Sequence, residues 1–220
     1  MKKPAVVIVS GGLDSTVLLH FVAKCFPFDV YALSFNYGQR HSKELECAKY
    51  QANCAGCKEH KIVDISSIKE LLSSSALIDV SKNIPSQEYS VEVARHTYVP
   101  NRNMIMLSIA VAYAENIGAK HVFYGAHLTD AESVYLDCRF NFIKAVSEAS
   151  SLATYNQVRI IAPFATFRKE DIVLLGAGLG VDFSKTWSCY RGEDAPCKTC
   201  ATCLERKKAF ENCGLQDPLS

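Results

Sequence analysis

The sequence predicts an α/β protein with a parallel five-stranded sheet, helices on both faces of the sheet, and a small cysteine-rich region at its C-terminal end. Three observations support this prediction. Short apolar runs rich in β-branched residues alternate with longer segments of helical period, an order typical of parallel sheets covered on both faces. In addition, the first apolar run ends in a glycine-rich turn, and four of the ten cysteines lie within fifteen residues.

The predicted elements follow one another in a regular order. The first strand is the apolar run 6–9, and a helix over 13–25 follows the glycine-rich turn. A helix over 101–117 has a continuous apolar row, and Gly118 is placed to end it. The other predicted strands are 29–35, 59–65, 120–124 and 158–162, and the other predicted helices are 41–54, 68–72, 137–154, 169–178 and 203–212.

Two further expectations concern the organisation of the chain. The stretch 73–98 is rich in serine and lacks a clean period, so we expect a long loop there, of the kind that is usually functional or mobile. Asp137 is placed to cap the helix that follows it. We expect one α/β domain over residues 1–183 and a small metal-binding region with a terminal helix over residues 184–220.

The glycine-rich turn is the strongest functional signal. It joins a buried strand to a helix, where backbone N–H groups converge and the helix dipole favours an anion. Gly11 and Gly12 let the backbone approach that anion, and hydroxyl donors surround them. We therefore expect a phosphate or pyrophosphate to bind here, the alternative being an ordinary glycine-rich turn. The turn consists of Ser10, Gly11, Gly12, Leu13, Asp14, Ser15 and Thr16.

The sequence of the turn excludes two common types of phosphate-binding loop. No lysine follows the glycines, as a Walker A loop requires, and the glycine spacing is not that of a dinucleotide fingerprint. Asp14 would repel a phosphate directly, but it is suited to hold Mg²⁺ or to cap the helix. Because ligands of parallel sheets bind beyond the carboxyl ends of the strands, we expect segments 10–16, 34–40 and 125–137 to converge on one cleft.

Composition excludes several classes of function. The formal net charge of +1 gives no broad basic surface, so we do not expect nucleic acid as a partner. No apolar run reaches the roughly 18 residues of a membrane span. Lys2 and Lys3 precede an apolar run over 5–9 that is too short for a signal peptide. We therefore expect a cytoplasmic chain whose thiols stay reduced.

The crowded cysteines have the spacing of a metal site. The cluster consists of Cys189, Cys197, Cys200 and Cys203, and successive cysteines are separated by seven, two and two residues. Four thiolates favour a closed, tetrahedral Zn²⁺ site, and an iron–sulfur cluster is the alternative. Nearby basic residues, Arg206 among them, would offset the thiolate charge. A separate pair, Cys54 and Cys57, is interpreted as structural rather than redox-active.

Several motifs together resemble one family, the 7-cyano-7-deazaguanine synthases (QueC) of the ATP pyrophosphatase (PP-loop) superfamily. These motifs span essentially the whole chain. The resemblance implies an adenine nucleotide alpha hydrolase-like fold and a homodimer. It is carried by residues 10–16, 35–41 with 44–45, 97–103, 137–139 and 186–190, together with the last three clustered cysteines and Arg206.

The resemblance also implies a reaction. The carboxylate of 7-carboxy-7-deazaguanine would attack the α-phosphate of ATP, giving an acyl-adenylate and pyrophosphate. Ammonia would then form an amide, and a second adenylation with loss of AMP would leave the nitrile. The implied cofactors are ATP, Mg²⁺ and Zn²⁺. The implied substrates are 7-carboxy-7-deazaguanine and ammonia.

Residue roles follow from the same resemblance. The turn 10–16 would hold the phosphates, with adenine read near Leu33, Ser34 and Phe35. The predicted catalytic residues are Asp14, Arg102, Asp137, Arg139 and Lys169. The predicted substrate residues are Tyr37, Arg40, Arg95, Tyr98, Asn103, Asp137 and Arg139. Each has a plainer interpretation, such as a helix cap for Asp137 and a surface charge for Arg139 or Lys169. His41 and His127 are interpreted as structural.

One motif departs from the family's pattern. Val134 and Leu136 stand where the family's substrate loop has glycine and proline. Valine disfavours positive φ, so a different backbone path is expected there. Two alternatives to the nitrile-forming reaction stay open, and the altered loop bears on the first of them. The activated acyl group could pass to another amine, such as one on a protein, or the chain could be a nucleotide-binding module without catalysis.

Overall fold

The computed structural model describes residues 2–40, 43–129, 135–192 and 194–220. Five parallel strands form one sheet in the order β3-β2-β1-β4-β5. The predicted fold class is therefore confirmed. The strands are β1 (Lys3–Ile8), β2 (Phe28–Asn36), β3 (Glu59–Asp64), β4 (His121–Phe123) and β5 (Arg159–Ile161).

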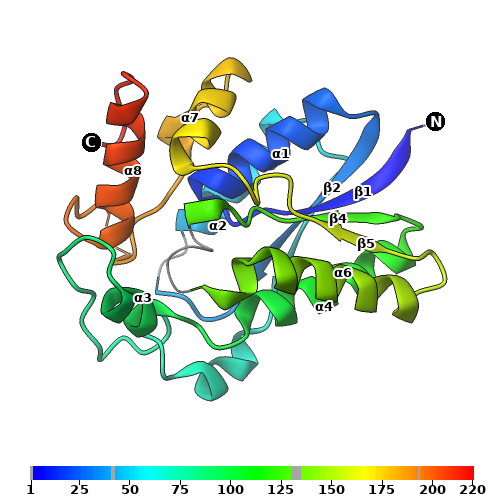
Figure 1. Cartoon of the computed structure of the whole chain (residues 1–220), viewed down its shortest axis with the longest axis horizontal. Helices are drawn as coiled ribbons and strands as arrows, with labels where there is room; N and C mark the ends of the chain where they lie inside the picture. Colours follow the sequence, from blue (N-terminus) through cyan, green and yellow to red (C-terminus); the bar gives the residue numbers. More distant parts are fainter. Residues whose placement is uncertain (1, 41–42, 130–134, 193) are drawn as a thin grey trace.

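Helices cover both faces of the sheet (Figure 1). One face carries α1 (Leu13–Cys25), α2 (Lys43–Cys54) and α7 (Lys169–Gly178), with α8 (Ala201–Asn212) packed beyond α7. The other face carries α4 (Arg102–Asn116) and α6 (Phe140–Ala153). The short helices are α3 (Val91–Thr97) and the 3-10 turns η1 (Ser66–Leu72), η2 (Leu136–Cys138) and η3 (Phe183–Lys185).

Side chains of β1 alternate between two apolar cores, as the period of a strand requires. Val6 belongs to the core under α4 and α6, whereas Val7 and Val9 belong to the core under α1 and α7. The C-terminal region contributes to both, with Trp187 in the first and Phe210 in the second. The cysteine-rich segment is therefore packed against the main domain.

One sequence prediction about local structure is wrong in part, and another is wrong. Residues 73–90 of the predicted loop hold no helix or strand, but the stretch ends in α3, whose start is capped by the Ser90 hydroxyl accepting from the Val93 N–H at 3.2 Å. Seven residues are too few to show a helical period. Asp137 lies in η2 and does not cap α6, whose N-cap is Arg139. Its carboxylate instead accepts from the backbone N–H of Asn103 in the first turn of α4, at 3.3 Å.

The strand order indicates where a parallel sheet of this kind binds its ligand. The chain leaves β1 toward β2 on one side and returns to β4 on the other side of β1. This is the switch point at which parallel sheets bind ligands, beyond the carboxyl ends of the strands. The glycine-rich turn after β1 lies at that position.

Candidate functional site

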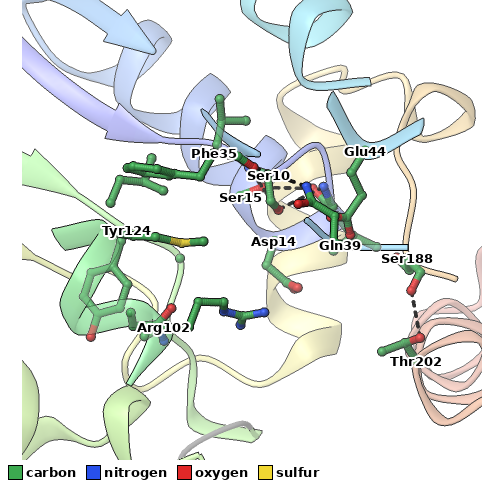
Figure 2. Close-up of a pocket in the computed structure, with 18 of the residues that line it drawn as sticks. Ser10, Asp14, Ser15, Phe35, Gln39, Glu44, Arg102, Tyr124, Ser188 and Thr202 are labelled. Carbon is green, nitrogen blue, oxygen red and sulfur yellow. Dashed lines mark hydrogen bonds between the residues drawn. The ribbon is translucent and has the colours of Figure 1, made fainter. Parts of the chain in front are cut away.

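The turn after β1 is held by its own serine hydroxyls (Figure 2). Ser15 Oγ accepts from the Ser10 N–H at 3.0 Å and lies 2.9 Å from Ser10 Oγ. Ser10 Oγ in turn accepts from the Gly12 N–H at 3.2 Å. Gly12 is the N-cap of α1, and as a glycine it has no side chain to bond the first-turn N–H groups. The positive end of α1 therefore faces the cleft and is suited to an anion.

Close packing against α2 requires glycine at position 11, in addition to any approach of the backbone to an anion. Its φ is +87°, and a Cβ atom there would lie 1.9 Å from the carbonyl oxygen of Glu44 in α2. The Gly11 carbonyl accepts from the Trp187 N–H at 2.9 Å. The turn is thus clamped between α2 and the segment that leads to Cys189.

Asp14 projects from the first turn of α1 into the cleft. Its Oδ2 lies 2.9 Å from Lys169 Nζ and 3.8 Å from His127 Nε2. Burial alone would raise the pKa of Asp14, but Lys169 and His127 outweigh it and lower the pKa, so the group is an anion. Its Oδ1 is buried without a hydrogen-bond partner in the described part of the chain. A buried anionic oxygen with spare capacity fits a hard divalent cation such as Mg²⁺.

The opposite wall of the cleft is built on α4. The Arg102 guanidinium lies over the Tyr37 ring, 5.7 Å from its centre, and donates to the Tyr37 hydroxyl at 3.4 Å. Burial would lower the pKa of Arg102, but Tyr37, Tyr190 and Asp137 raise it above its usual range. Arg102 and Asp14 both project into the cleft (Figure 2). A permanent cation therefore faces the glycine-rich turn across the cleft.

A smaller pocket opens beside Arg102. It shares Arg102, Asn103 and Cys138 with the cleft and adds Tyr98 and Asp137. Tyr98 Oη accepts from the Asn101 N–H at 3.1 Å, and the Tyr124 hydroxyl donates to the Asp137 carbonyl at 3.3 Å. The pocket thus has aromatic walls and a few polar groups, which suits a planar polar ring.

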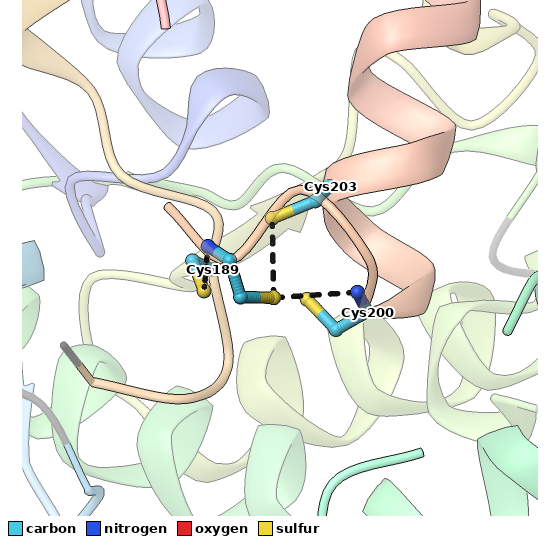
Figure 3. A group of neighbouring side chains, drawn as sticks. Cys189, Cys200 and Cys203 are labelled. Carbon is cyan, nitrogen blue, oxygen red and sulfur yellow. Dashed lines mark hydrogen bonds between the residues drawn. The ribbon is translucent and has the colours of Figure 1, made fainter. Parts of the chain in front are cut away.

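The four clustered cysteines lie together at the start of α8 (Figure 3). Their sulfurs are all within 4.8 Å of one another. Two backbone N–H groups donate to sulfur, from Cys197 to Cys189 Sγ and from Cys200 to Cys197 Sγ, both at 3.3 Å. Four soft donors in one cluster fit the tetrahedral coordination of Zn²⁺.

The comparisons with known proteins agree with this geometry. The model of the family "Queuosine biosynthesis protein QueC" matches residues 4–214. The chain belongs to the QueC family. Among its relatives, 7-cyano-7-deazaguanine synthase of Archaeoglobus fulgidus is 50% identical over 98% of this chain and 89% of its own length. The protein of the same name from Caldicellulosiruptor bescii is 47% identical over 98% of this chain and 96% of its own length.

Solved structures extend the likeness in fold. NMN synthetase from Francisella tularensis superposes with a TM-score of 0.53 at 15% identity, covering 98% of this chain and 79% of that one. NH3-dependent NAD synthetase from Campylobacter jejuni gives a TM-score of 0.51 at 18% identity, covering 84% and 67%. At these identities the likeness concerns the fold alone. Within the described residues, no helix has the length and apolar content to cross a membrane.

Most residues that the QueC motifs indicate do line the cleft or its side pocket. This holds for most of the glycine-rich turn and for Phe35. The other predicted residues lining the cleft or the pocket are Tyr37, Arg40, Tyr98, Arg102, Asn103, Asp137 and Lys169. Arg40, however, directs its guanidinium at the backbone carbonyls of Ala76, Asp79 and Lys82. It therefore holds the 76–82 segment beside the cleft.

Other predicted site residues lie elsewhere. Arg95 and Arg139 are exposed, on α3 and at the N-cap of α6, outside the described residues that line the cleft. Thr16 is fully buried in α1 and is not among the described residues that line the cleft. Ser34 is also buried, and its hydroxyl donates to the Val9 carbonyl at 2.6 Å.

Further outcomes concern the sheet edge and the metal region. The Leu33 carbonyl is used within the sheet by the Val9 N–H at 2.9 Å. His41 and Val134 lie outside the described residues. Arg206 does not offset the thiolates as expected, because it is buried and pairs with Asp217 at 2.9 Å.

The second cysteine pair lies at the C-terminal end of α2. Cys54 ends α2, Gly56 takes a φ of +69°, and the Cys57 N–H donates to the Ala52 carbonyl at 3.1 Å. This is the hydrogen-bond pattern of a glycine-ended helix C-terminus. The geometry favours the structural interpretation of these two cysteines.

Two carboxylates of the cleft have no role predicted from the sequence. Glu44 lines it from α2, where burial raises its pKa to about 8 although Arg102 opposes the shift. Glu205 lines it from α8, with its Oε2 atom 3.1 Å from Lys169 Nζ. Glu44 lies in a motif segment, but no local pattern in the sequence indicates that it is buried. The one sequence signal for Glu205 is that it lies two residues after Cys203.

Proposed function

We propose that this chain is a 7-cyano-7-deazaguanine synthase, which adenylates 7-carboxy-7-deazaguanine and converts it with ammonia to the nitrile. The observation that carries the proposal is the pairing of two binding regions in one cleft. The turn after β1 offers a helix N-terminus to phosphates, and a side pocket with Asp137 and Tyr98 adjoins it across Arg102. Full-length identity to proteins of that name supports the same assignment.

The nucleotide would lie over the turn, with its phosphates on the first N–H groups of α1. Asp14 Oδ1, buried and unpartnered in the described part of the chain, would hold Mg²⁺. When bound, Mg²⁺ offsets the charge of the departing pyrophosphate. Lys169 lies 2.9 Å from Asp14 and would add a second positive charge beside the phosphates.

The carboxylate to be activated would enter from the side pocket. Arg102 lies at the boundary of the two regions and lines both. Its permanent charge would hold the carboxylate against the α-phosphate and balance the negative charge that develops during attack. The amide and the nitrile then require the same carbonyl carbon to be activated twice, so both steps would use this one position.

The ring of the substrate would occupy the side pocket. Asp137 is buried there, and its Oδ2 accepts from the Asn103 N–H at 3.3 Å. A carboxylate has several acceptor positions, so it keeps capacity for the amino and ring N–H donors of a guanine-like face. Tyr98 supplies an aromatic wall.

The cysteine cluster would hold Zn²⁺ as a structural ion, because four thiolates leave no position open to substrate. A homodimer stays a prediction of the resemblance, and a cytoplasmic location stays a prediction from the composition. Neither alternative acceptor chemistry nor a non-catalytic role gains support from the relatives, which carry the name of the synthase.

The proposal is tested by incubating the purified chain with ATP, Mg²⁺, ammonia and 7-carboxy-7-deazaguanine. We expect mass spectrometry to detect AMP, pyrophosphate and 7-cyano-7-deazaguanine. AMP together with an amide as the final product would point to arrest after the first adenylation. Absence of AMP would overturn the proposal.

A further inference from the structure

A lysine shared by two carboxylates links the cysteine region to the nucleotide-binding turn. Lys169 Nζ lies 2.9 Å from Asp14 Oδ2 and 3.1 Å from Glu205 Oε2. The three side chains are 12%, 22% and 16% exposed, and all line the cleft. Partial enclosure of this kind strengthens ion pairs relative to the protein surface.

The position of Glu205 depends on the cysteine cluster. Cys200 is the N-cap of α8, and Cys203 lies in the first turn of that helix, two residues before Glu205. In the same turn, Thr202 Oγ1 donates to the Ser188 carbonyl at 2.8 Å (Figure 2). Cross-linking the sulfurs by a metal therefore fixes the helix turn that presents Glu205.

The cysteine-rich segment also contacts the glycine-rich turn through Trp187. The Trp187 N–H donates to the Gly11 carbonyl at 2.9 Å, and Trp187 Nε1–H donates to the Cys189 carbonyl at 3.0 Å. The cysteine segment thus contacts the glycine-rich turn through the backbone and contacts Asp14 through Lys169 and Glu205. The cysteine segment and the glycine-rich turn are therefore connected by two independent sets of contacts.

We propose that Glu205 is a positioning residue, which holds the Lys169 ammonium beside the nucleotide phosphates, and that the cysteine cluster sets this position through α8. The inference rests on the proposed function for the identity of the nucleotide. If Glu205 is absent, Lys169 pairs fully with Asp14 and competes with the divalent cation for that carboxylate. With Glu205 present, Lys169 keeps a counter-charge when Asp14 turns to the cation.

The test is the Mg²⁺ requirement of nucleotide binding. Trp187 is the one tryptophan of the chain and lines the cleft, so its fluorescence reports ATP binding without turnover. We expect Glu205→Gln to raise the Mg²⁺ concentration for half-maximal ATP binding about tenfold, the scale of one charge-assisted hydrogen bond. KM for the deazaguanine acid should stay unchanged, because that pocket lies beyond Arg102.

Glu211→Gln is the matched control, since Glu211 lies on the same helix and pairs with Lys207 at the surface, 62% exposed. It should leave the Mg²⁺ requirement unchanged. Metal content and the unfolding temperature are measured for every variant. Removal of the cluster metal, with the chelator dialysed away before Mg²⁺ is added, should raise the Mg²⁺ requirement in the parent chain and add little to it in Glu205→Gln, because both changes act on Lys169.

Three results would overturn the proposal: a normal Mg²⁺ requirement in Glu205→Gln, an equal change in Glu211→Gln, or loss of the cluster metal from Glu205→Gln. The last would mean that Glu205 acts on the cluster and not on Lys169. Failure of the proposed function is seen separately, because it appears as absence of nitrile from the parent chain whether or not ATP binding depends on Glu205.

Discussion

The carbonyl oxygen of Glu44 lies 1.9 Å from the point that a Cβ atom on Gly11 would occupy. Gly11→Ala must therefore displace α2 or the turn, and it also places a side chain at a φ of +87°. We expect it to abolish ATP binding and to lower the free energy of unfolding by about 2 kcal/mol or more. Gly178→Ala is the control, because space is open at that helical position. Unchanged ATP binding in Gly11→Ala would contradict the clamped geometry of the turn.

Glu44 predicts a pH dependence of stability. Burial raises its pKa from 4.5 to about 8, with Arg102 opposing. Between these values the unfolded chain ionises this group while the native chain keeps it protonated. Its contribution to stability is therefore fully present below the lower value and is lost as pH rises toward about 8, by up to about 1.4 kcal/mol per unit.

Glu44→Gln removes this titration. Thermal unfolding should show the variant more stable than the parent near pH 8.5, with little difference near pH 4.5. Glu46→Gln, exposed on the same helix, is the control and should show no such divergence. A difference between Glu44→Gln and the parent that is the same at both pH values would show that burial does not raise this pKa.

Arg206 and Asp217 form a buried ion pair that anchors the end of the chain. Their side chains are 4% and 5% exposed, and Arg206 also donates to Thr186 Oγ1 at 2.6 Å. Asp217→Asn leaves the guanidinium without its counter-charge, so we expect a loss of about 3–5 kcal/mol in urea unfolding. A loss no larger than that of the surface variant Glu211→Gln would contradict the role assigned to this pair.

The cysteine cluster predicts a metal-dependent C-terminal region. Cys200 is fully buried at the N-cap of α8, and its N–H donates to Cys197 Sγ. Cys200→Ser should release the bound metal, measured by elemental analysis, and should increase proteolysis of the region after residue 184. Cys25→Ser, at an exposed site on α1, should retain the metal. A metal-free Cys200→Ser chain of unchanged stability would refute a structural metal.

Local patterns predicted much of the fold. α1 and α7 have the bounds predicted from the sequence. Gly12 precedes α1 and Pro27 follows it, and Gly178 ends α7. The glycine-rich turn and the cysteine cluster were also accessible, since each depends on residues close together in sequence. The turn's own hydroxyl network, within residues 10–15, is of this local kind.

Contacts between distant segments could not be predicted in the same way. Asp137 looks like a cap for the helix that follows it, yet it bonds the Asn103 N–H, 34 residues earlier. Arg206 looks like a counter-charge for the thiolates, but the chain end returns and pairs Asp217 with it. Glu205 meets Asp14 across Lys169 because α8 packs against α7. Each depends on how elements pack, which no short stretch of sequence records.

The most direct test of the account follows an oxygen atom. If the carboxylate of 7-carboxy-7-deazaguanine attacks the α-phosphate of ATP over the turn at Asp14, a heavy-oxygen label in that carboxylate must pass to AMP. We expect mass spectrometry to find the label in AMP and none in pyrophosphate, together with the nitrile. Label in inorganic phosphate with formation of ADP, or AMP that carries no label, would contradict the account.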